Sequence, residues 1–370
     1  MIFYFWEGTD YSFGRSLRTY TWISSLEHVA KHFDAEFKVF DVAGGTAESA
    51  APVINLPEPH SKECIFFISH DLNWNHNVFT KHVKDNFPNS KIVIYGTDLD
   101  AWNINICKNR FLTNTPADLY NSDWFSDYSK SLDFGKVYNK YKKNDRLFFK
   151  GLEAIKDSSI DLFLDCLGYV CDDASRLWNS RRYIYNVSTS VAEQFLSKKE
   201  EAEIEFDGIC LANFHVSTDS DRGQMHNYLN ENGYKLRIGG DQDKEKHEID
   251  FIRSLYAKSK VCLGTSTRGG RLHPRSAKGF RDWIAPLCGI PLIYDDYSQV
   301  ADLPVEIPFY KWQKWEEIIE LTDVLYRDTK LRKRIVEEQT EFSLANTLDK
   351  QLINIFNDVL FSTEQKVGIN

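Results

Sequence analysis

Short apolar runs alternate with amphipathic stretches along most of this sequence. Four of the runs have the length and the β-branched or aromatic content of buried strands: residues 2–6, 36–42, 64–69 and 91–95. Between the first two runs, residues 16–32 repeat apolar positions at helical spacing. Parallel sheets with helices on both faces produce this alternation, because their strands are buried on both sides. The pattern therefore predicts an α/β fold.

The alternation continues in weaker form and then resumes after a charge-dense linker at residues 198–203. Weaker strand candidates precede the linker at residues 118–122 and 160–164. A further strand is predicted at residues 182–187, and it leads into a helix capped by Ser188 or Ser190. Beyond the linker, strands are predicted at residues 208–213, 235–238, 261–264 and 291–294. Helices are predicted between them at residues 221–232, 245–259 and 278–288.

The second of these three helices carries one apolar stripe. Ile249, Ile252 and Tyr256 share the stripe, whereas Asp250 and Arg253 lie off it. This arrangement is typical of a helix packed on a sheet through one face. We therefore expect Asp250 and Arg253 outside the packed face.

A chain of 370 residues is too long for one ordinary core. The two series of strands predict two Rossmann-like domains that face each other across a cleft. We place the first domain at residues 1–200 and the second at residues 201–340. Because the tail at residues 312–360 is helical in pattern, we expect a C-terminal helix in residues 341–370 to return to the first domain.

Composition limits the classes of partner and compartment. The formal net charge of −9 argues against wholesale wrapping by nucleic acid, which needs many phosphate-neutralising cations. The seven cysteines form neither a Cys-x-x-Cys pair nor a zinc-type spacing, so we expect reduced thiols, mostly in the core, in a cytoplasmic protein. The N-terminal run lacks a basic leader, and no apolar stretch is long enough to span a bilayer, so we expect no membrane anchor.

Five cations gather in one short segment of this acidic protein: Arg268, Arg271, Arg275, Lys278 and Arg281. Gly269 and Gly270 lie beside the first of them. Arginine forks bind phosphate oxygens, glycines allow close backbone approach, and a helix that begins near Lys278 offers free N–H groups. The segment also follows a predicted strand, where open α/β sheets bind ligands. It predicts a diphosphate site, and the alternative is a solvated basic loop.

The same segment resembles the C-terminal domain of the retaining group-1 glycosyltransferases of the GT-B fold, in particular the spore-maturation-like branch. The matching stretches are RGGRLHPR at residues 268–275, KGFRDW at 278–283 and APLCGIPLIYDD at 285–296. A weaker likeness extends back to about Gly208. The resemblance implies that the donor diphosphate is bound by the following residues: Arg268, Arg271, Arg275, Lys278 and Gly279.

The chain departs from this family at two positions. Counted from Cys288 and Gly289, the family's two glutamates fall on Ser276 and Ile284, and neither is acidic. The second family glutamate typically binds the nucleotide ribose, which an isoleucine cannot do. We take Asp282 as the candidate substitute; Asp295 and Asp296 are the alternatives.

Two groups of residues in the first half of the chain are expected to face the predicted cleft. The loop after the first strand contains Gly8, Thr9, Gly14 and Arg15 and resembles the family's glycine-bearing first loop, although its glycines also fit ordinary turns. Residues 97–100 follow the strand at 91–95 and supply two carboxylates, Asp98 and Asp100.

We take Asp98 and Asp100 as catalytic candidates, because a carboxylate at a strand's carboxyl end can act as a base or orient a sugar. His70 and Asp71, after the strand at residues 64–69, are a rival pair. Asp-x-Asp also occurs in metal sites, but it recurs elsewhere in the chain, so we expect no metal.

A basic and aromatic run at residues 136–143 bears on the acceptor. Its cations are Lys136, Lys140, Lys142 and Lys143. Cations interleaved with aromatics suit phosphate contacts and base stacking, although a solvated helix face has the same composition. The setting of residues 92–98 also faintly resembles phage DNA glucosyltransferases, which would need the target base extruded from the duplex.

These features predict transfer of a sugar from a nucleotide diphosphate donor, expected to be a UDP-sugar, to a hydroxyl acceptor. The resemblance implies retention of configuration, and no cofactor is required besides the donor. The acceptor is either a glycan or small molecule, or a hydroxymethylated base in DNA. The alternative is a catalytically silent nucleotide-sugar-binding module of the same fold. A dehydrogenase is disfavoured, because no Gly-x-Gly-x-x-Gly follows the first strand.

Overall fold

The structure is a computed structural model, and it describes residues 1–7, 17–41, 57–69, 76–96, 160–165, 179–197, 202–211, 221–238, 249–264, 283–295, 310–312 and 314–361. Backbone contacts divide the chain into two compact units. One comprises Met1–Thr9 and Lys38–Ser180, and the other comprises Asp10–Phe37 and Arg181–Asn370. The predicted domain boundary near residue 200 stays a prediction.

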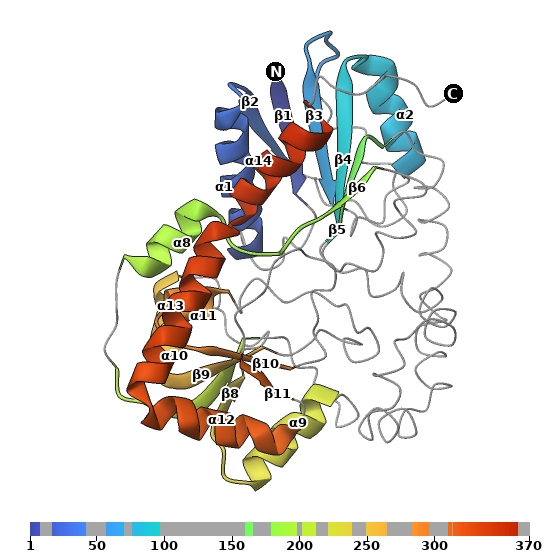
Figure 1. Ribbon diagram of the computed structural model, residues 1–370. Coiled ribbons are helices and arrows are strands. Elements are labelled where there is room, and N and C mark those ends of the chain that lie inside the picture. The colour runs from blue at the N-terminus through green and yellow to red at the C-terminus, as the bar shows by residue number, and fades with distance from the viewer. Residues whose placement is uncertain are drawn as a thin grey trace, which may run out of the picture. The chain divides into compact units, whose positions relative to one another are not determined.

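The first sheet has six strands in the order β2-β1-β3-β4-β5-β6 (Figure 1). Their bounds are Ile2–Glu7 for β1, Glu36–Asp41 for β2, Cys64–Ser69 for β3, Ser90–Gly96 for β4, Leu162–Asp165 for β5 and Ser180–Arg182 for β6. Strands β1, β3, β4 and β5 pair in parallel. The strands predicted from the apolar runs at the start of the chain are confirmed, and the candidate at residues 118–122 lies outside the described residues.

Aromatic rings fill one face of this sheet. Tyr4 of β1 and Phe66 of β3 lie with ring centroids 5.0 Å apart, and Phe87, just beyond helix α2 (His76–Asn86), lies 5.0 Å from Phe66. The Tyr4 hydroxyl is 2.8 Å from Nε2 of His60, whose ring meets Phe87 edge to face. Such pairs stabilise a core beyond the area they bury.

The second sheet has five strands in the order β11-β10-β9-β7-β8, and all neighbours pair in parallel. Its strands are β7 (Phe206–Cys210), β8 (Leu236–Ile238), β9 (Ser259–Gly264), β10 (Leu292–Asp295) and β11 (Tyr310–Trp312). The helices of this part are α9 (Asp221–Glu231), α10 (Ile249–Ala257), α11 (Ile284–Leu287), α12 (Trp315–Arg327) and α13 (Thr329–Ala345). The predicted series of strands and helices is confirmed, although the described part of the helix predicted at 278–288 is α11.

The main core of the second unit lies between this sheet and helices α9, α12 and α13. Its buried members are Cys210, Met225, Leu229, Tyr234, Val261, Leu263, Ile293, Trp312, Ile318, Leu325 and Ile335. The Tyr234 hydroxyl is 2.9 Å from Oγ1 of Thr322 and lies where a Cβ on Gly208 would need space. Burial raises the pKa of Tyr234 despite that hydrogen bond, so the phenol stays protonated.

At the start of β10, a side chain takes the place of a neighbouring strand as the hydrogen-bond partner of the backbone. The buried Gln339 of α13 accepts a hydrogen bond from the Leu292 N–H at 2.9 Å and donates one to the Leu292 carbonyl at 2.8 Å. The amide therefore satisfies both backbone groups where β11 does not reach. The tail at residues 312–360 was expected to be helical, and the structure has the helices α12, α13 and α14 there, but Trp312 belongs to β11. A three-residue strand is too short to show a period in the sequence.

Three helices from distant parts of the sequence pack together in the second unit: α1 (Leu17–His32), α8 (Thr189–Leu196) and α14 (Leu348–Val359). Figure 1 shows α14 alongside α1. Beyond the end of α1, the Phe33 ring lies 4.5 Å from the Phe361 ring and 6.4 Å from that of Phe356. Helix α14 thus packs on α1 and α8, which both lie within residues 1–200, and the predicted domain bounds stay a prediction. None of the helices in the described ranges has the length and apolar character needed to cross a bilayer.

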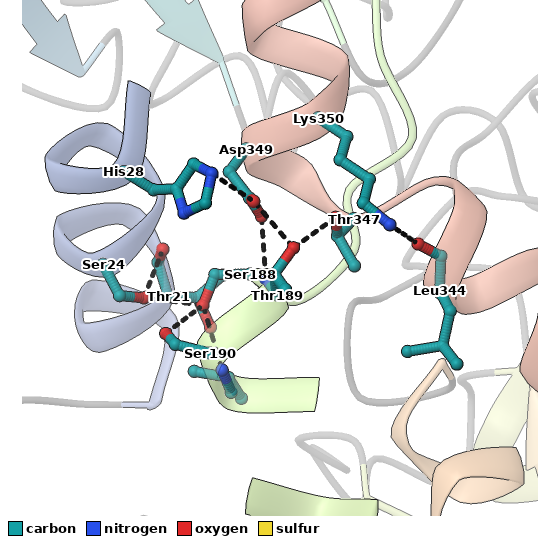
Figure 2. Close-up of polar contacts among 11 residues, drawn as sticks. Thr21, Ser24, His28, Ser188, Thr189, Ser190, Leu344, Thr347, Asp349 and Lys350 are labelled. Atoms are coloured by element: carbon teal, nitrogen blue, oxygen red, sulfur yellow. Dashed lines mark hydrogen bonds and ion pairs between the residues drawn. The ribbon is translucent and has the colours of Figure 1, made fainter. Parts of the chain in front are cut away.

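A part-buried set of hydrogen bonds, the polar junction (Thr189, Thr347 and Asp349), joins the start of α8 to the start of α14 (Figure 2). Asp349 accepts from the backbone N–H and from the hydroxyl of Thr189, both at 2.7 Å. Because that hydroxyl gives its proton to Asp349, the Thr347 hydroxyl, 2.9 Å away, donates to it. The carboxylate also faces the positive end of α8, whose N-cap is Ser188, one of the two serines predicted for this position.

The segment at residues 182–187 was expected to be a strand, and this is wrong beyond Arg182. Its backbone bonds to side chains and to the start of α14 instead of to a strand. Gln351 pairs with both the N–H and the carbonyl of Ile184, at 2.7 and 3.0 Å, and the Leu348 N–H donates to the Val187 carbonyl. The fully buried Asn186 donates to the carbonyls of Ser343 and Asn346. These tertiary bonds leave no sequence pattern.

The expectation that Arg253 lies outside the packed face of its helix is also wrong. Its side chain is 3% exposed. The guanidinium donates hydrogen bonds to the Asp250 carboxylate at 2.5 Å and to the Gln194 carbonyl near the end of α8. The guanidinium carbon lies 5.9 Å from the centre of the Phe195 ring. Because α8 covers this side of α10, the cation satisfies a helix C-terminus there.

Four cysteines lie in the described part of the chain, and their thiols are free: Cys64, Cys210, Cys262 and Cys288. The first three are buried, as expected of core thiols. Burial raises the pKa of Cys64 to about 12, although Lys84 opposes the shift. This thiol is therefore protonated and unreactive at neutral pH.

Replacing Asp349 with alanine should lower the free energy of unfolding by about 2–3 kcal/mol, because Thr189 loses its two hydrogen bonds to this buried carboxylate. Asp358→Ala is the matched control on the same helix. Asp358 is 68% exposed and pairs with Arg181 at 3.3 Å, so its loss should cost under about 1 kcal/mol. Urea denaturation of the two variants measures both values. Equal effects would contradict a structural role for the polar junction.

Candidate functional site

The strand order of the second sheet reverses direction between β7 and β9. The chain leaves β7 toward β8 on one side and leaves β9 toward β10 on the other. Adjacent parallel strands whose connections run in opposite directions leave a gap at their carboxyl ends, and open α/β sheets bind ligands there. The two strands end at Cys210 and Gly264.

The cation-rich segment is the connection that leaves β9 at this point. Residues 265–282 follow Gly264 directly and end one residue before Trp283, the N-cap of α11. The segment itself lies outside the described residues, including the predicted diphosphate ligands Arg268, Arg271, Arg275, Lys278 and Gly279 and the candidate Asp282. The residues that flank it, Gly264 and Trp283, are described. The topology therefore supports the segment's position without testing the role of any one cation.

At the start of the segment, Gly264 lies against the ring of Tyr294. A Cβ built on Gly264 would overlap ring atoms of Tyr294, a fully buried residue of β10. The register of β9 and β10 places these two residues opposite each other. The glycine is therefore required by close packing.

At the end of the segment, Trp283 is buried and its ring stacks on Phe342 of α13, with centroids 5.2 Å apart. The Ser343 hydroxyl donates to the Trp283 carbonyl at 3.3 Å. Ile284, where the resembled family has its second glutamate, is fully buried. An acidic side chain at this position would carry an unpaired charge into the core, so the missing glutamate is consistent with the packing here.

The first sheet has its own reversal between β1 and β3. The chain leaves β1 toward β2 on one side and leaves β3 toward β4 on the other. The predicted cleft loop with Gly8, Thr9, Gly14 and Arg15 follows β1, and the rival pair His70 and Asp71 follows β3. These two connections flank the reversal.

The catalytic candidates Asp98 and Asp100 follow β4, one strand further along the sheet. Like the two connections at the reversal, they lie outside the described residues. Lys136, Lys140, Lys142 and Lys143 also lie outside them. The topology thus gives His70 and Asp71 as good a position as Asp98.

Sequence reasoning missed the residues that hold the ends of the cation-rich segment, Tyr294, Trp283, Phe342 and Ser343. The one signal available was Gly264, a glycine that ends an apolar strand, which is typical of a close approach by another group. No three His, Cys, Asp or Glu side chains converge to form a metal site within the described ranges.

No protein-family model matches the chain, and no curated protein matches its sequence. Solved structures are similar along nearly all of it. Sucrose-phosphate synthase from Thermosynechococcus elongatus gives a TM-score of 0.53 at 9% identity, covering 98% of this chain and 100% of that chain. The T4 phage β-glucosyltransferase in complex with UDP-glucose gives 0.53 at 10% identity, covering 97% and 98%. Anabaena HepE in complex with UDP-glucose gives 0.51 at 10% identity, covering 98% and 100%.

These structures are GT-B glycosyltransferases, and the chain has their fold. The predicted α/β architecture of two Rossmann-like domains is therefore confirmed. At identities of 9–10% the likeness shows the fold alone.

Replacing Gly264 with alanine should lower the free energy of unfolding by about 1–3 kcal/mol, because the buried Tyr294 ring has no space to yield. In a Tyr294→Ala background the added methyl group has room, and the same change should cost under about 0.5 kcal/mol. Urea denaturation of the four proteins in this cycle measures the coupling. An equal cost in both backgrounds would contradict the contact.

Proposed function

We propose that the chain is a glycosyltransferase that moves a sugar from a nucleotide diphosphate donor, a UDP-sugar, to a hydroxyl acceptor. The observation that carries the proposal is the position of the cation-rich segment. It leaves β9 beside the reversal of a parallel sheet, in a chain with the GT-B fold. Two of the three solved structures named above are complexes with UDP-glucose, which supports the choice of donor.

The chemistry of such a site depends on charge and positioning. As the sugar leaves, negative charge develops on the departing diphosphate, and the cations of residues 268–281 stabilise it. Two substrates held in the reacting geometry supply most of the remaining rate. Arg271 and Lys278 bind the diphosphate in this account, and the proposed mechanism needs no metal for that step.

The roles of the acidic residues stay proposals. Asp282 is placed at the donor ribose, and Asp98 or Asp100 at the acceptor or the sugar. Retention of configuration rests on the resemblance to the group-1 enzymes. His70 and Asp71 are the second choice for the acid and base, because their connection flanks the reversal in the first sheet.

The acceptor is either a glycan or small molecule, or a hydroxymethylated base in DNA. The similarity to a phage enzyme described as DNA modifying supports the second choice. The basic run with Lys136, Lys140, Lys142 and Lys143 would then contact phosphates. The net charge of −9 limits that contact to a local patch.

A silent binding module is the second candidate function. The observation that favours it is Ile284, fully buried where the resembled family has a ribose-binding glutamate. Such a module would keep the donor site and lack turnover.

Arg271→Ala and Lys278→Ala should each weaken UDP binding by about 10- to 100-fold, the loss of about 1.5–3 kcal/mol expected for a charge-assisted bond to phosphate. Isothermal titration calorimetry measures the dissociation constants. Lys333→Ala is the matched control, because this lysine is 78% exposed on α13 and pairs only loosely with Glu337 at 3.8 Å. UDP binding of Arg271→Ala and Lys278→Ala equal to that of the control would remove the donor-site assignment.

Turnover separates the enzyme from the silent module. The wild-type chain should release UDP from UDP-glucose, slowly with water and faster with a suitable hydroxyl acceptor. Mass spectrometry of hydroxymethylated DNA and of simple glycans after incubation should show a mass gain of one hexose on one acceptor class. Binding of UDP-glucose without UDP release under any of these conditions would favour the silent module.

A further inference from the structure

A basic surface lies where helix α12 ends and helix α13 begins (Figure 1). Residues 326–334 hold five cations and one acid, in a chain whose formal net charge is −9. We call this surface the basic corner, and its cations are Arg327, Lys330, Arg332, Lys333 and Arg334. We propose that the basic corner is a docking surface for the phosphate backbone of nucleic acid. The inference goes beyond the proposed function, because docking there needs neither a donor nor turnover.

The cations at the start of α13 are unfavourable for the helix itself. Asp328 caps the helix by accepting from the Leu331 N–H at 2.9 Å, but no acid follows in the first turn, where the helix dipole favours one. Lys330 lies in that turn and has the same charge as its neighbours on the helix surface, Lys333 and Arg334. Helix α12 has the ordinary arrangement, with two glutamates in its first turn. Cations that act against their own helix indicate a role outside it.

These cations are available to a phosphate backbone. Lys333 and Arg334 are exposed and lie 3.8 Å from Glu337 and Glu338, a separation too long for a hydrogen bond. Both pairs also place the cation before the acid in the helix, which is the weaker orientation. In the part of the chain that the structure describes, no carboxylate pairs with Lys330. Exposed pairs of this kind contribute little, so exchanging them for phosphate contacts costs little.

An exposed aromatic ring connects the basic corner to the edge of the second sheet. The centre of the Tyr326 ring, a residue 43% exposed, lies 4.7 Å from Nζ of Lys260 and 6.0 Å from the guanidinium carbon of Arg332. Lys260 is near the start of β9, about 13 Å along the strand from Gly264, where the cation-rich segment departs. The basic corner is therefore at the amino end of the sheet, and nucleic acid bound there leaves the carboxyl ends of the strands to the donor.

The acids around the basic corner limit what can dock on it. They lie on both sides of it along the two helices: Glu320 and Asp323 on α12, and Glu337, Glu338 and Glu341 on α13. A flat anionic membrane would meet these acids together with the cations, whereas a narrow phosphate backbone can lie over the cations alone. Such contacts need no base readout, because Lys and Arg neutralise phosphates and release counterions whatever the sequence.

The test measures DNA affinity across salt concentrations. A short fluorescein-labelled duplex is titrated with the full chain, without donor, at about 50 to 200 mM NaCl, and fluorescence anisotropy gives the dissociation constant. The combined change Lys330→Gln, Lys333→Gln and Arg334→Gln should reduce the salt slope of the logarithm of the affinity by about 2–3, since each phosphate contact contributes about 0.9. At the lowest salt concentration it should raise the dissociation constant by at least about tenfold.

The combined change Lys31→Gln, Lys62→Gln and Lys81→Gln is the matched control. These three lysines are also exposed, and their loss changes the net charge by the same amount. The control should keep the wild-type DNA affinity within about twofold, with the wild-type salt slope. The basic-corner variant should keep the wild-type Tm and, like Lys333→Ala, the wild-type UDP affinity, because neither the helix nor the donor site depends on these cations.

Equal weakening of DNA binding in both triple variants would show that net charge alone acts and would overturn the inference. A wild-type chain without measurable DNA affinity at the lowest salt concentration would overturn it too. So would a basic corner whose loss weakens binding to vesicles of phosphatidylcholine and phosphatidylserine but leaves binding to the duplex unchanged. A wild-type chain that binds the duplex through the basic corner but does not bind UDP would remove the proposed function alone.

Discussion

Parallel pairing of β7 with β9 is the constraint on which the second unit depends. Because the two strands are neighbours in the sheet but not in the chain, β8 and β10 must lie on opposite sides of them. The chain therefore leaves β7 and β9 toward opposite sides of the pair, and open α/β sheets bind ligands at the carboxyl ends of such strands. Backbone hydrogen bonds thus determine where chemistry can take place before any side chain is considered. The proposed role of the cation-rich segment depends on this position, because the segment follows β9.

Much of the fold could be predicted from the sequence because the strands are buried on both faces. Runs such as residues 64–69 have no polar side to confuse the pattern, and the structure has a strand with those bounds. The errors fall where tertiary contacts decide. Ile184 and Val187 satisfy their backbones through α14 and so form no strand. Arg253 is buried because another helix covers it, which its own helix cannot reveal.

The candidate site divides in the same way. A diphosphate site could be predicted because Arg, Lys and Gly are concentrated in one short segment. The binding role of these cations stays a prediction. The contacts of the residues that flank the segment could not be predicted, because Tyr294 lies on another strand from Gly264 and Phe342 is far along the chain from Trp283. Ile284 lies in the core, which explains why this position is apolar. In the proposed donor site, another residue must bind the ribose.

The central claim is that UDP binds at residues 265–282. Hydrogen–deuterium exchange of the full chain, followed by mass spectrometry with and without saturating UDP, tests it most directly. The account predicts slower exchange in peptides that cover residues 265–283 when UDP is present. Unchanged exchange in those peptides, with UDP protecting another part of the chain or none, would contradict it.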